Sequence, residues 1–406
     1  MLYTKPITEI TYVDVIDFCK QSLKENINLD YKLDVDTGIA KTIAAMANTW
    51  GGLIVVGVED EDSKPKLPVE GIPYREHIEE QINNIILGNI TPPTFPEVKV
   101  CLSENKEKMF VVIRIPQSNL TPHAIRGNTR VYIRTNTSNE PEEEITIEKL
   151  GWLVDKRKKS LDLKEQLHQE ADRRFEKLCR IQGIKNFRHN DVSLMTSPLY
   201  PFEILTKKEQ LIREIPERMR TEAWGRYFPK TLHRTSYEAI NGGSYAFISN
   251  GQSGYFLYEE FNHYGLFYHR EDWCKSDKDE ETGEIKHTGF LHSYLSEIDL
   301  MIESASKFYS AVGYWGLVEI KVIARELEEV NFRDLPAPKG FYKFDKLEKR
   351  PIDNNLEFTK EVSVRELVEK RVALVTYLML DLSWALGFTH IDEEGIGRLL
   401  EEQGRL

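Results

Sequence analysis

Three acidic side chains within the first 60 residues have the types and spacing of a metal site. Glu25 precedes the alternating segment 27–33, Asp30 lies inside that segment, and Asp60 directly follows the apolar run 53–58. Carboxylates from two adjacent strands can converge, and three can hold a hard divalent cation while leaving positions open for water. The alternative is that these acids are exposed charges at strand edges, and their spacing alone favours that alternative.

Lys32 stands two residues after Asp30 on the same predicted face. An ammonium group beside the acids would lower their pKa values or contact a phosphate. Segment 27–33 alternates, with Asn28, Asp30 and Lys32 opposite its apolar residues, which predicts a half-buried strand.

The neighbouring segments predict the elements that position these side chains. Residues 39–48 form an apolar stripe at helical spacing, with Asp36 and Thr37 as candidate N-caps. Gly51 and Gly52 end this helix, and the continuous apolar run that follows is typical of a strand covered on both faces. We expect Asn48 and the two glycines to be structural. Trp50 could stack on a base, but we expect it to be buried against a neighbour.

The rest of the first 150 residues continues as mixed α and β. A helix is predicted over 75–87, a hairpin over 98–103 and 109–115, and a strand over 129–135. Arg130 and Arg134 share a face of that last strand, where they either bind phosphates or simply line an exposed surface.

From residue 145 the pattern becomes one long helical stretch, which carries the basic run Lys156, Arg157, Lys158 and Lys159. The run is compatible with a phosphate-binding strip, although charge alone favours a solvated helix face. Beyond it we predict a hairpin over 242–249 and 254–261, a strand over 265–270 and an exposed loop over 271–290. Helices are predicted over 292–312, 363–387 and 392–403.

Composition bounds the protein class. The 406 residues are 40% hydrophobic and 30% charged, which is globular and favours two domains. The net charge of −12 argues against coating nucleic acid by bulk attraction. Four scattered cysteines and an N-terminus without an apolar signal core lead us to expect a cytoplasmic protein. The apolar segment 372–388 contains Asp381, so we expect a buried or subunit-contact helix and no membrane span.

Common catalytic signatures are absent from the sequence. It contains no phosphate-binding loop of the GxxxxGK[ST] type, no HExxH, no GxSxG and no CxxC pair. The histidines, such as His168, His263 and His269, do not fall at metal-ligand spacing, and we expect them to be isolated polar positions.

Four motifs in order closely resemble the AlbA-like domain of the Schlafen family. They are ENINLDYK, NTWGGLIVVGVEDED, VEGI and RVYIRTNTSNEP, spread over roughly residues 20–150. The resemblance implies that Glu25, Asp30 and Asp60 form a catalytic triad that binds Mg²⁺ or Mn²⁺, with Lys32 as the lysine that follows the second acid. The family usually has Glu where this chain has Asp30, so the ligand geometry is in question.

The resemblance implies an α+β fold with a mixed-sheet AlbA-like domain at residues 1–150. A helical connector at 151–190 then leads to a second α+β or mostly helical accessory domain at 191–406. The function expected is a metal-dependent endoribonuclease for structured, tRNA-like RNA, with anti-phage defence as a family role. The alternatives are a nucleic-acid-binding regulator without turnover and, from the family alone, an ATP-binding protein. Vertebrate relatives pair two such lobes in one chain, so we expect this single lobe to form a homodimer.

Overall fold

The computed structural model describes the chain except for residues 1, 3–4, 119, 128, 135–141, 185–188, 202–203, 251–253, 279–282, 315, 336–347 and 406. The chain divides into two compact units, residues 1–161 and 162–406. The division lies inside one long helix, α4 (Ile147–Ile181), so both units share the segment expected as a connector. The end of the fourth motif, NTSNEP, lies outside the described residues.

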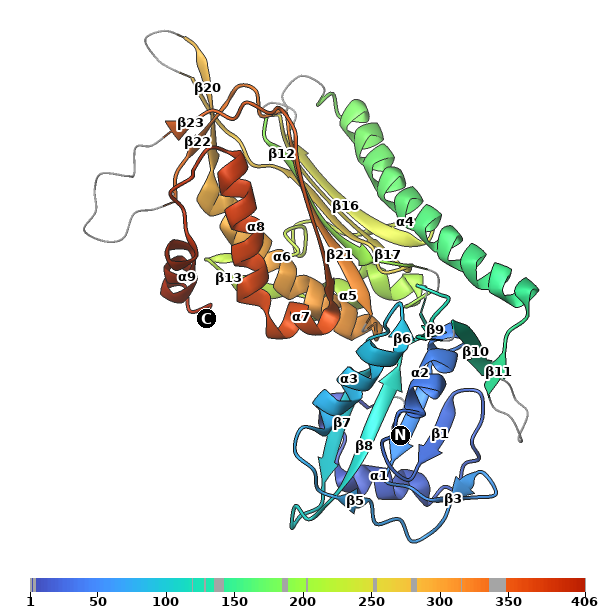
Figure 1. The fold of residues 1–406 in the computed structure, drawn as a ribbon. Helices are drawn as coiled ribbons and strands as arrows, with labels where there is room; N and C mark the ends of the chain where they lie inside the picture. The colour runs from blue at the N-terminus through green and yellow to red at the C-terminus, as the bar shows by residue number, and fades with distance from the viewer. Residues whose placement is uncertain are drawn as a thin grey trace. The chain divides into compact units, whose positions relative to one another are not determined.

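The first unit is built on a five-stranded mixed sheet (Figure 1). Strand β1 runs parallel to β2, and the other pairings are antiparallel. Strand β1 (Leu29–Lys32) pairs with β2 (Gly52–Val56), β2 pairs with β8 (Lys108–Ile115), and β8 pairs with the short β5 (Ile72–Pro73). Strand β7 (Glu97–Leu102) also pairs with β8. The predicted hairpin and mixed sheet are therefore confirmed.

Helices cover both faces of this sheet. Helices α2 (Ile39–Asn48) and α3 (Ile78–Asn89) bury their stripes against one face, where Ile54 and Val56 of β2 point. Helix α1 (Tyr12–Cys19) packs with Leu53 and Val55 on the other face. Alternate residues of one strand thus enter two cores, which is why the run 53–58 is continuously apolar. Gly51, with φ +71°, lets the turn before β2 lie against the carbonyl of Ile115, where a Cβ would clash at 2.6 Å.

A second, four-stranded sheet lies over α2 in the same unit. Its order is β11 (Glu142–Glu144), β10 (Arg130–Arg134), β9 (Ala124–Ile125) and β6 (Ile90–Thr91). The short hairpin β3 (Asp60–Glu61) and β4 (Lys64–Pro65) and the turn η1 (Ile7–Glu9) complete this unit.

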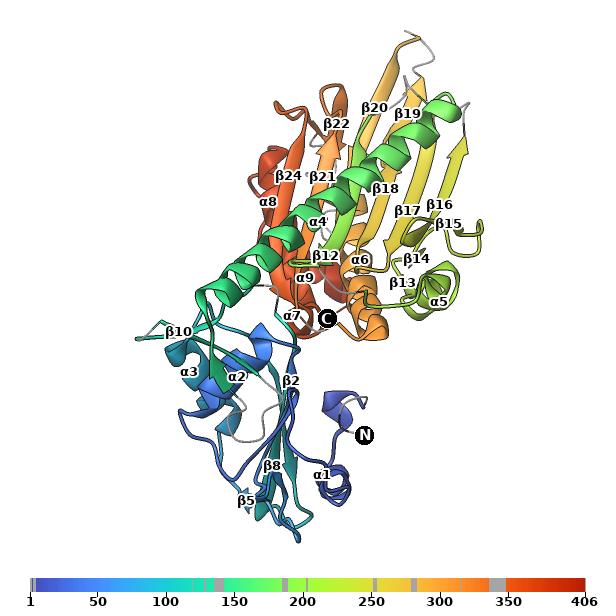
Figure 2. The same cartoon turned by 90° about the vertical axis from the view of Figure 1, so that its right-hand side faces the viewer.

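The second unit is also α+β, around a seven-stranded antiparallel sheet (Figure 2). The order is β15 (Glu238–Ile240), β16 (Gly243–Asn250), β17 (Tyr255–Asn262), β18 (Phe267–Asp272), β12 (Asp191–Pro198), β21 (Leu317–Arg325) and β24 (Leu356–Ser363). The C-terminal part of α4 crosses one face, where Phe175 packs on Phe256 and Tyr258.

The opposite face of this sheet carries the larger core. Helices α6 (Leu291–Val312) and α8 (Arg371–Ala385) lie side by side on it. The same unit also contains the short elements α5 (Glu214–Arg218), α7 (Val364–Glu369), α9 (Glu393–Glu402), η2 (Lys208–Ile212), β13 (Thr221–Ala223) and β14 (Arg226–Phe228). The predicted helix 363–387 is broken, because Lys370 leaves helical geometry and separates α7 from α8.

The apolar segment 372–388 belongs to the core of the second unit. Helix α8 buries Val375, Leu378, Met379 and Leu382 in this core. Of the two alternatives expected for the segment, the structure therefore shows the buried helix. Across the described residues, none of the helices combines the length and the hydropathy needed to span a membrane.

The loop predicted over 271–290 is wrong for its described residues. Strands β19 (Lys275–Lys278) and β20 (Ile285–Phe290) pair there. Strand β20 also pairs with β22 (Val330–Arg333), and β22 pairs with β23 (Glu348–Lys349), which gives a four-stranded sheet. The side chains of β19 are exposed throughout, so the strand has no apolar alternation from which to predict it.

Candidate functional site

A tight turn brings Glu25 back alongside strand β1. The amide of Asn28 donates to the side-chain oxygen of Asn26 at 2.9 Å, a turn typical of asparagine. The main chains of Asn26 and Leu29 bond to each other in both directions. The chain therefore reverses, and Glu25 Oε1 accepts a hydrogen bond from the Tyr31 amide at 2.8 Å.

The β3–β4 hairpin places Asp60 near the same turn. Asp62 and Ser63 form its two-residue loop, and both have positive φ, which is the geometry of a hairpin turn that matches strand twist. The Glu25 amide donates to the Ser63 carbonyl at 2.8 Å, so the loop is fixed to the Glu25 segment. Asp60 itself is exposed.

Asp30 occupies a different environment, because it is buried and paired with two cations. Its side chain is 1% exposed. Arg134 Nη1 donates to Oδ1 at 3.0 Å, and Lys32 Nζ lies 2.6 Å from Oδ2. The predicted alternation of strand 27–33 holds, since Leu29 and Tyr31 enter a core while Asp30 pairs with Lys32. The polar face is buried at Asp30, however, because the guanidinium of Arg134 covers it there.

Arg134 joins several elements of this region. Its Nη2 donates to the carbonyls of Asn26 and Leu29, at 2.8 and 3.1 Å, and its amide donates to Thr49 Oγ1 at 2.9 Å. The guanidinium is fully buried, whereas Arg130 on the same strand is exposed and pairs with Glu144 at 3.5 Å. Arg130 and Arg134 share the same parity along β10, as predicted, but they differ in burial: Arg134 reaches the Asp30 carboxylate, whereas Arg130 stays exposed.

Asn48 anchors the end of α2 to the same strand. Its amide nitrogen donates to the carbonyls of Tyr132 and His123, both at 2.9 Å, and its oxygen accepts from the His123 amide at 2.8 Å. Asn48 is therefore structural, as expected. Trp50 is 66% exposed, so its expected burial is wrong; the turn that carries it projects from the end of α2.

The electrostatics of the three acids centre on Glu25. Burial raises the pKa of the Glu25 carboxyl, and the negative charges of Asp30 and Asp60 raise it further. The Tyr31 amide and the Lys32 ammonium act in the opposite direction. Glu25 thus lies within electrostatic reach of both other acids and of Lys32.

The three carboxylates do not form a closed metal cage. Among the described residues, one group of three His, Cys, Asp or Glu side chains has ligand atoms within 4.8 Å of one another, and it lies in the second unit. Carboxylates are the donor type that Mg²⁺ prefers, so the chemistry of the set suits a hard cation. Asp60 is exposed, while Asp30 is engaged by Arg134 and Lys32. Of the three acids, Glu25 and Asp60 are the two that could hold such an ion without breaking the buried Asp30–Arg134 pair.

The basic run on α4 divides into buried and exposed positions. Lys156 is 3% exposed, and its Nζ donates to the Ser118 carbonyl at 3.3 Å. Lys158 and Lys159 are exposed, and Arg157 is half-buried. The four residues therefore do not form one solvent-facing strip, since consecutive helix positions point in different directions.

Sequence reasoning missed charged groups in the second unit that are far apart in the chain. His269 is fully buried, with Nδ1 3.0 Å from Glu259 and Nε2 3.4 Å from Glu271, and His168 bonds to Ser197 at 3.0 Å. We expected these two histidines to be isolated polar positions, and that expectation is wrong. Alternating polar residues in 259–271 were the available signal, but alternation does not show which groups meet.

Comparison with known proteins identifies the first unit. Residues 16–143 match the family model described as Schlafen, AlbA_2, and no curated protein matches the chain. Among solved structures, the chain is similar to the solution NMR structure of the N-terminal domain of a Nitrosomonas europaea protein described as ATP-dependent DNA helicase RecG-related. The two are 14% identical over 34% of this chain and 95% of that one, with a TM-score of 0.27. On the family match, residues 16–143 form a Schlafen-type AlbA-like domain.

Proposed function

We propose that this protein is a metal-dependent endoribonuclease that acts on structured, tRNA-like RNA. The observation that carries the proposal is that Glu25 lies within electrostatic reach of Asp60 and Lys32, beside the buried Asp30–Arg134 pair. A Schlafen-type AlbA-like domain indicates a function related to nucleic acid. Acids that could hold a metal ion, with a lysine near them, are groups that can promote phosphodiester hydrolysis.

Each residue of this group has a distinct proposed role. Glu25 and Asp60 would hold Mg²⁺ or Mn²⁺, which when bound would activate water and neutralise charge on the scissile phosphate. Lys32, whose side chain is 35% exposed, would contact a phosphate oxygen. Asp30 would hold the Lys32 ammonium in place and complete the negative field around the ion. Arg134, being buried, would position Asp30 and would not bind RNA.

Exposed side chains of the first unit supply the proposed RNA contacts. Lys158, Lys159 and Arg130 are exposed cations that would bind backbone phosphates. Trp50 offers an exposed indole for stacking on an unpaired base. A role in anti-phage defence has no support beyond the resemblance.

A second candidate function is nucleic-acid binding without turnover. The favouring observation is that Asp30 is already paired with Arg134 and Lys32, which leaves its carboxylate engaged. In this alternative the acids organise the fold, and the exposed cations bind RNA.

One assay separates the two candidates. The full chain is incubated with a tRNA transcript and Mn²⁺, with and without EDTA, and products are separated on a denaturing gel. The nuclease proposal predicts cleavage that EDTA abolishes. Binding of RNA that stays intact, at every Mg²⁺ and Mn²⁺ concentration tried, would support the regulator instead.

We also propose that the chain works as a homodimer. One AlbA-like lobe offers one side of a cleft, and a second copy is the simplest source of the other side. Light scattering over a concentration series should give twice the mass of the chain. A monomer mass at micromolar concentration together with retained cleavage would show that one lobe suffices.

A further inference from the structure

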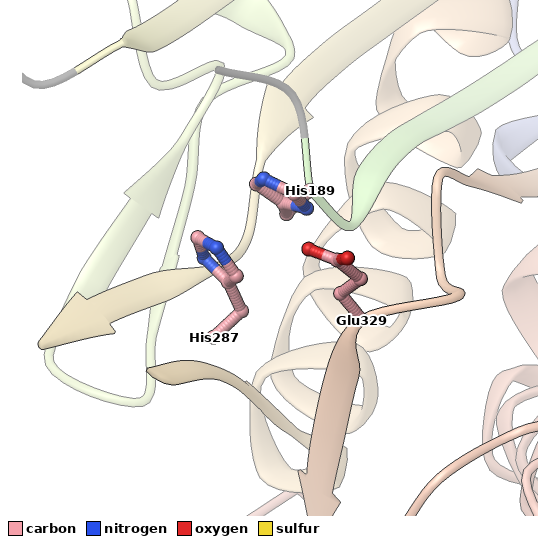
Figure 3. A group of neighbouring side chains, drawn as sticks. All are labelled: His189, His287 and Glu329. Carbon is pink, nitrogen blue, oxygen red and sulfur yellow. The ribbon is translucent and has the colours of Figure 1, made fainter. Parts of the chain in front are cut away.

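Two histidines and a glutamate meet in the second unit, from three segments far apart in the chain. His189 immediately precedes Asn190 and β12, His287 lies on β20, and Glu329 immediately precedes β22. Each side chain offers a ligand atom, and all three atoms lie within 4.8 Å of one another. Figure 3 shows the three side chains directed toward one another.

The segment that carries His189 is fixed by its neighbour Asn190. The Asn190 side chain is buried, donates to the Trp273 carbonyl at 3.1 Å and accepts from the Tyr294 hydroxyl. Its amide donates to the Glu326 carbonyl at 3.2 Å. These bonds join the start of β12 to the turn before β22, so His189 is held near the Glu329 segment.

The other two side chains are placed by strand pairing. Strands β20 and β22 are parallel, and His287 is in register with Val330, the residue after Glu329. The turn before β22 is closed by a bond from the Val330 amide to the Leu327 carbonyl at 3.0 Å. Asn354 supports it by accepting from the Glu328 amide at 2.9 Å. The backbone therefore holds the two side chains next to each other independently of any ion.

His287 has the hydrogen bond that orients a metal-binding imidazole. Its Nδ1 lies 2.9 Å from Ser276 Oγ on the paired strand β19, where the two residues are in register. With Nδ1–H donating to the hydroxyl, the lone pair of Nε2 is available for a metal, an arrangement typical of ligating histidines. The His189 and His287 rings stack with centroids 3.6 Å apart and planes at 21°. Burial and the neighbouring His189 lower the pKa of His287.

We propose that His189, His287 and Glu329 bind a divalent transition-metal ion of the zinc class. Two imidazole nitrogens and one carboxylate oxygen are a donor set that Zn²⁺ accepts, whereas Mg²⁺ prefers oxygen ligands alone. Three protein ligands leave a fourth position for water or another group. The bound ion would join the start of β12, strand β20 and the turn before β22. This site is separate from the carboxylates of the first unit and does not depend on the proposed nuclease function.

Titration calorimetry of the chelator-stripped full chain with Zn²⁺ tests the site. We expect one Zn²⁺ per chain, with affinity at least about 100-fold weaker in His287→Ala and in Glu329→Gln, because each loses a direct ligand. Ser276→Ala should weaken binding about tenfold through the lost orienting bond.

The matched control is His233→Ala. His233 is an exposed histidine of the same unit that lies 3.9 Å from Glu217 and, among the described residues, belongs to no group of three possible metal ligands. This control should bind Zn²⁺ as the wild type does. A Co²⁺ absorption spectrum gives a second readout, because it should change when His189 or His287 is replaced in a variant whose circular dichroism is unchanged. Absence of Zn²⁺ binding, or equal affinity in the wild type, His287→Ala and Glu329→Gln, would overturn the proposal.

Discussion

The Arg134 guanidinium donates to the Asp30 carboxylate at 3.0 Å, with both side chains buried, and so connects β10 of one sheet to β1 of the other. The two residues are 104 positions apart in the chain. Arg134 also binds two carbonyls of the turn that carries Glu25. One side chain therefore positions the buried acid and the segment of a second acid.

Removing Arg134 should destabilise the first unit strongly. Arg134→Ala leaves the Asp30 carboxylate buried with one of its two cations lost, and breaking a buried pair in this way costs about 3–5 kcal/mol. Arg130→Ala is the matched control, because that arginine is exposed on the same strand and should change the free energy of unfolding by about 0.5 kcal/mol or less. Urea denaturation followed by circular dichroism measures both. Similar unfolding midpoints for the two variants would show that the pair does not hold the sheets together.

Glu25 should make stability depend on pH in a specific direction. Its pKa is raised above the ordinary value of 4.5 in the folded chain, so the unfolded chain releases this proton more readily. The group therefore lowers the free energy of unfolding as the pH rises from about 4.5 through the raised pKa. Glu25→Gln keeps an oxygen that can accept from the Tyr31 amide, and it should be more stable than the wild type at pH 7.

The comparison must be made across pH, with Glu61→Gln on the exposed β3 strand as control. The stability gain of Glu25→Gln should disappear at or below about pH 4, where both states hold the proton. Glu61→Gln should follow the wild type within about 0.5 kcal/mol. A Glu25→Gln variant that is less stable at pH 7 than at pH 4, relative to the wild type, would contradict the assignment.

The exposed lysines of α4 should control RNA affinity, and the buried one should not. Replacing Lys158 and Lys159 by Gln should weaken binding and reduce the magnitude of the salt slope by about 1.4 to 1.8, for two phosphate contacts. Lys156→Gln should instead lower stability, because Lys156 is buried and bonds to the Ser118 carbonyl. Fluorescence anisotropy at several salt concentrations measures the slope. An unchanged slope in the double variant would place the RNA surface elsewhere, with Arg130 as the next candidate.

Much of the fold of the first unit could be predicted because its elements are local and strongly patterned. Helix 39–48 and the apolar strand after it follow from periodicity, and the hairpin 98–115 from two apolar runs around a polar turn. Strand β19 could not be predicted, since both of its faces meet solvent. The break at Lys370 could not be predicted either, because no glycine or proline marks it.

The sequence offers the three acids as candidates but does not give their burial. The spacing of Glu25, Asp30 and Asp60 says that acids lie near two strands, and it says nothing of which one is covered. Asp30 is covered by Arg134, a residue from a different sheet, and such a long-range pair leaves no mark in a single sequence. Asp30→Ala is consequently a poor test of catalysis, since it removes a buried partner as well as a candidate ligand.

The most direct test of the nuclease proposal compares Asp60→Asn with Asp62→Asn. Both aspartates belong to the β3–β4 hairpin, but we propose only Asp60 as a metal ligand together with Glu25. The rate of Mn²⁺-dependent tRNA cleavage is measured for both at saturating RNA. We expect the rate to fall about 100-fold or more in Asp60→Asn, because loss of even a supporting residue of a metal site costs about 10- to 100-fold. Asp62→Asn should cleave at a rate near that of the wild type. Equal rates in the two variants, or cleavage that persists in both after chelation, would contradict the proposal.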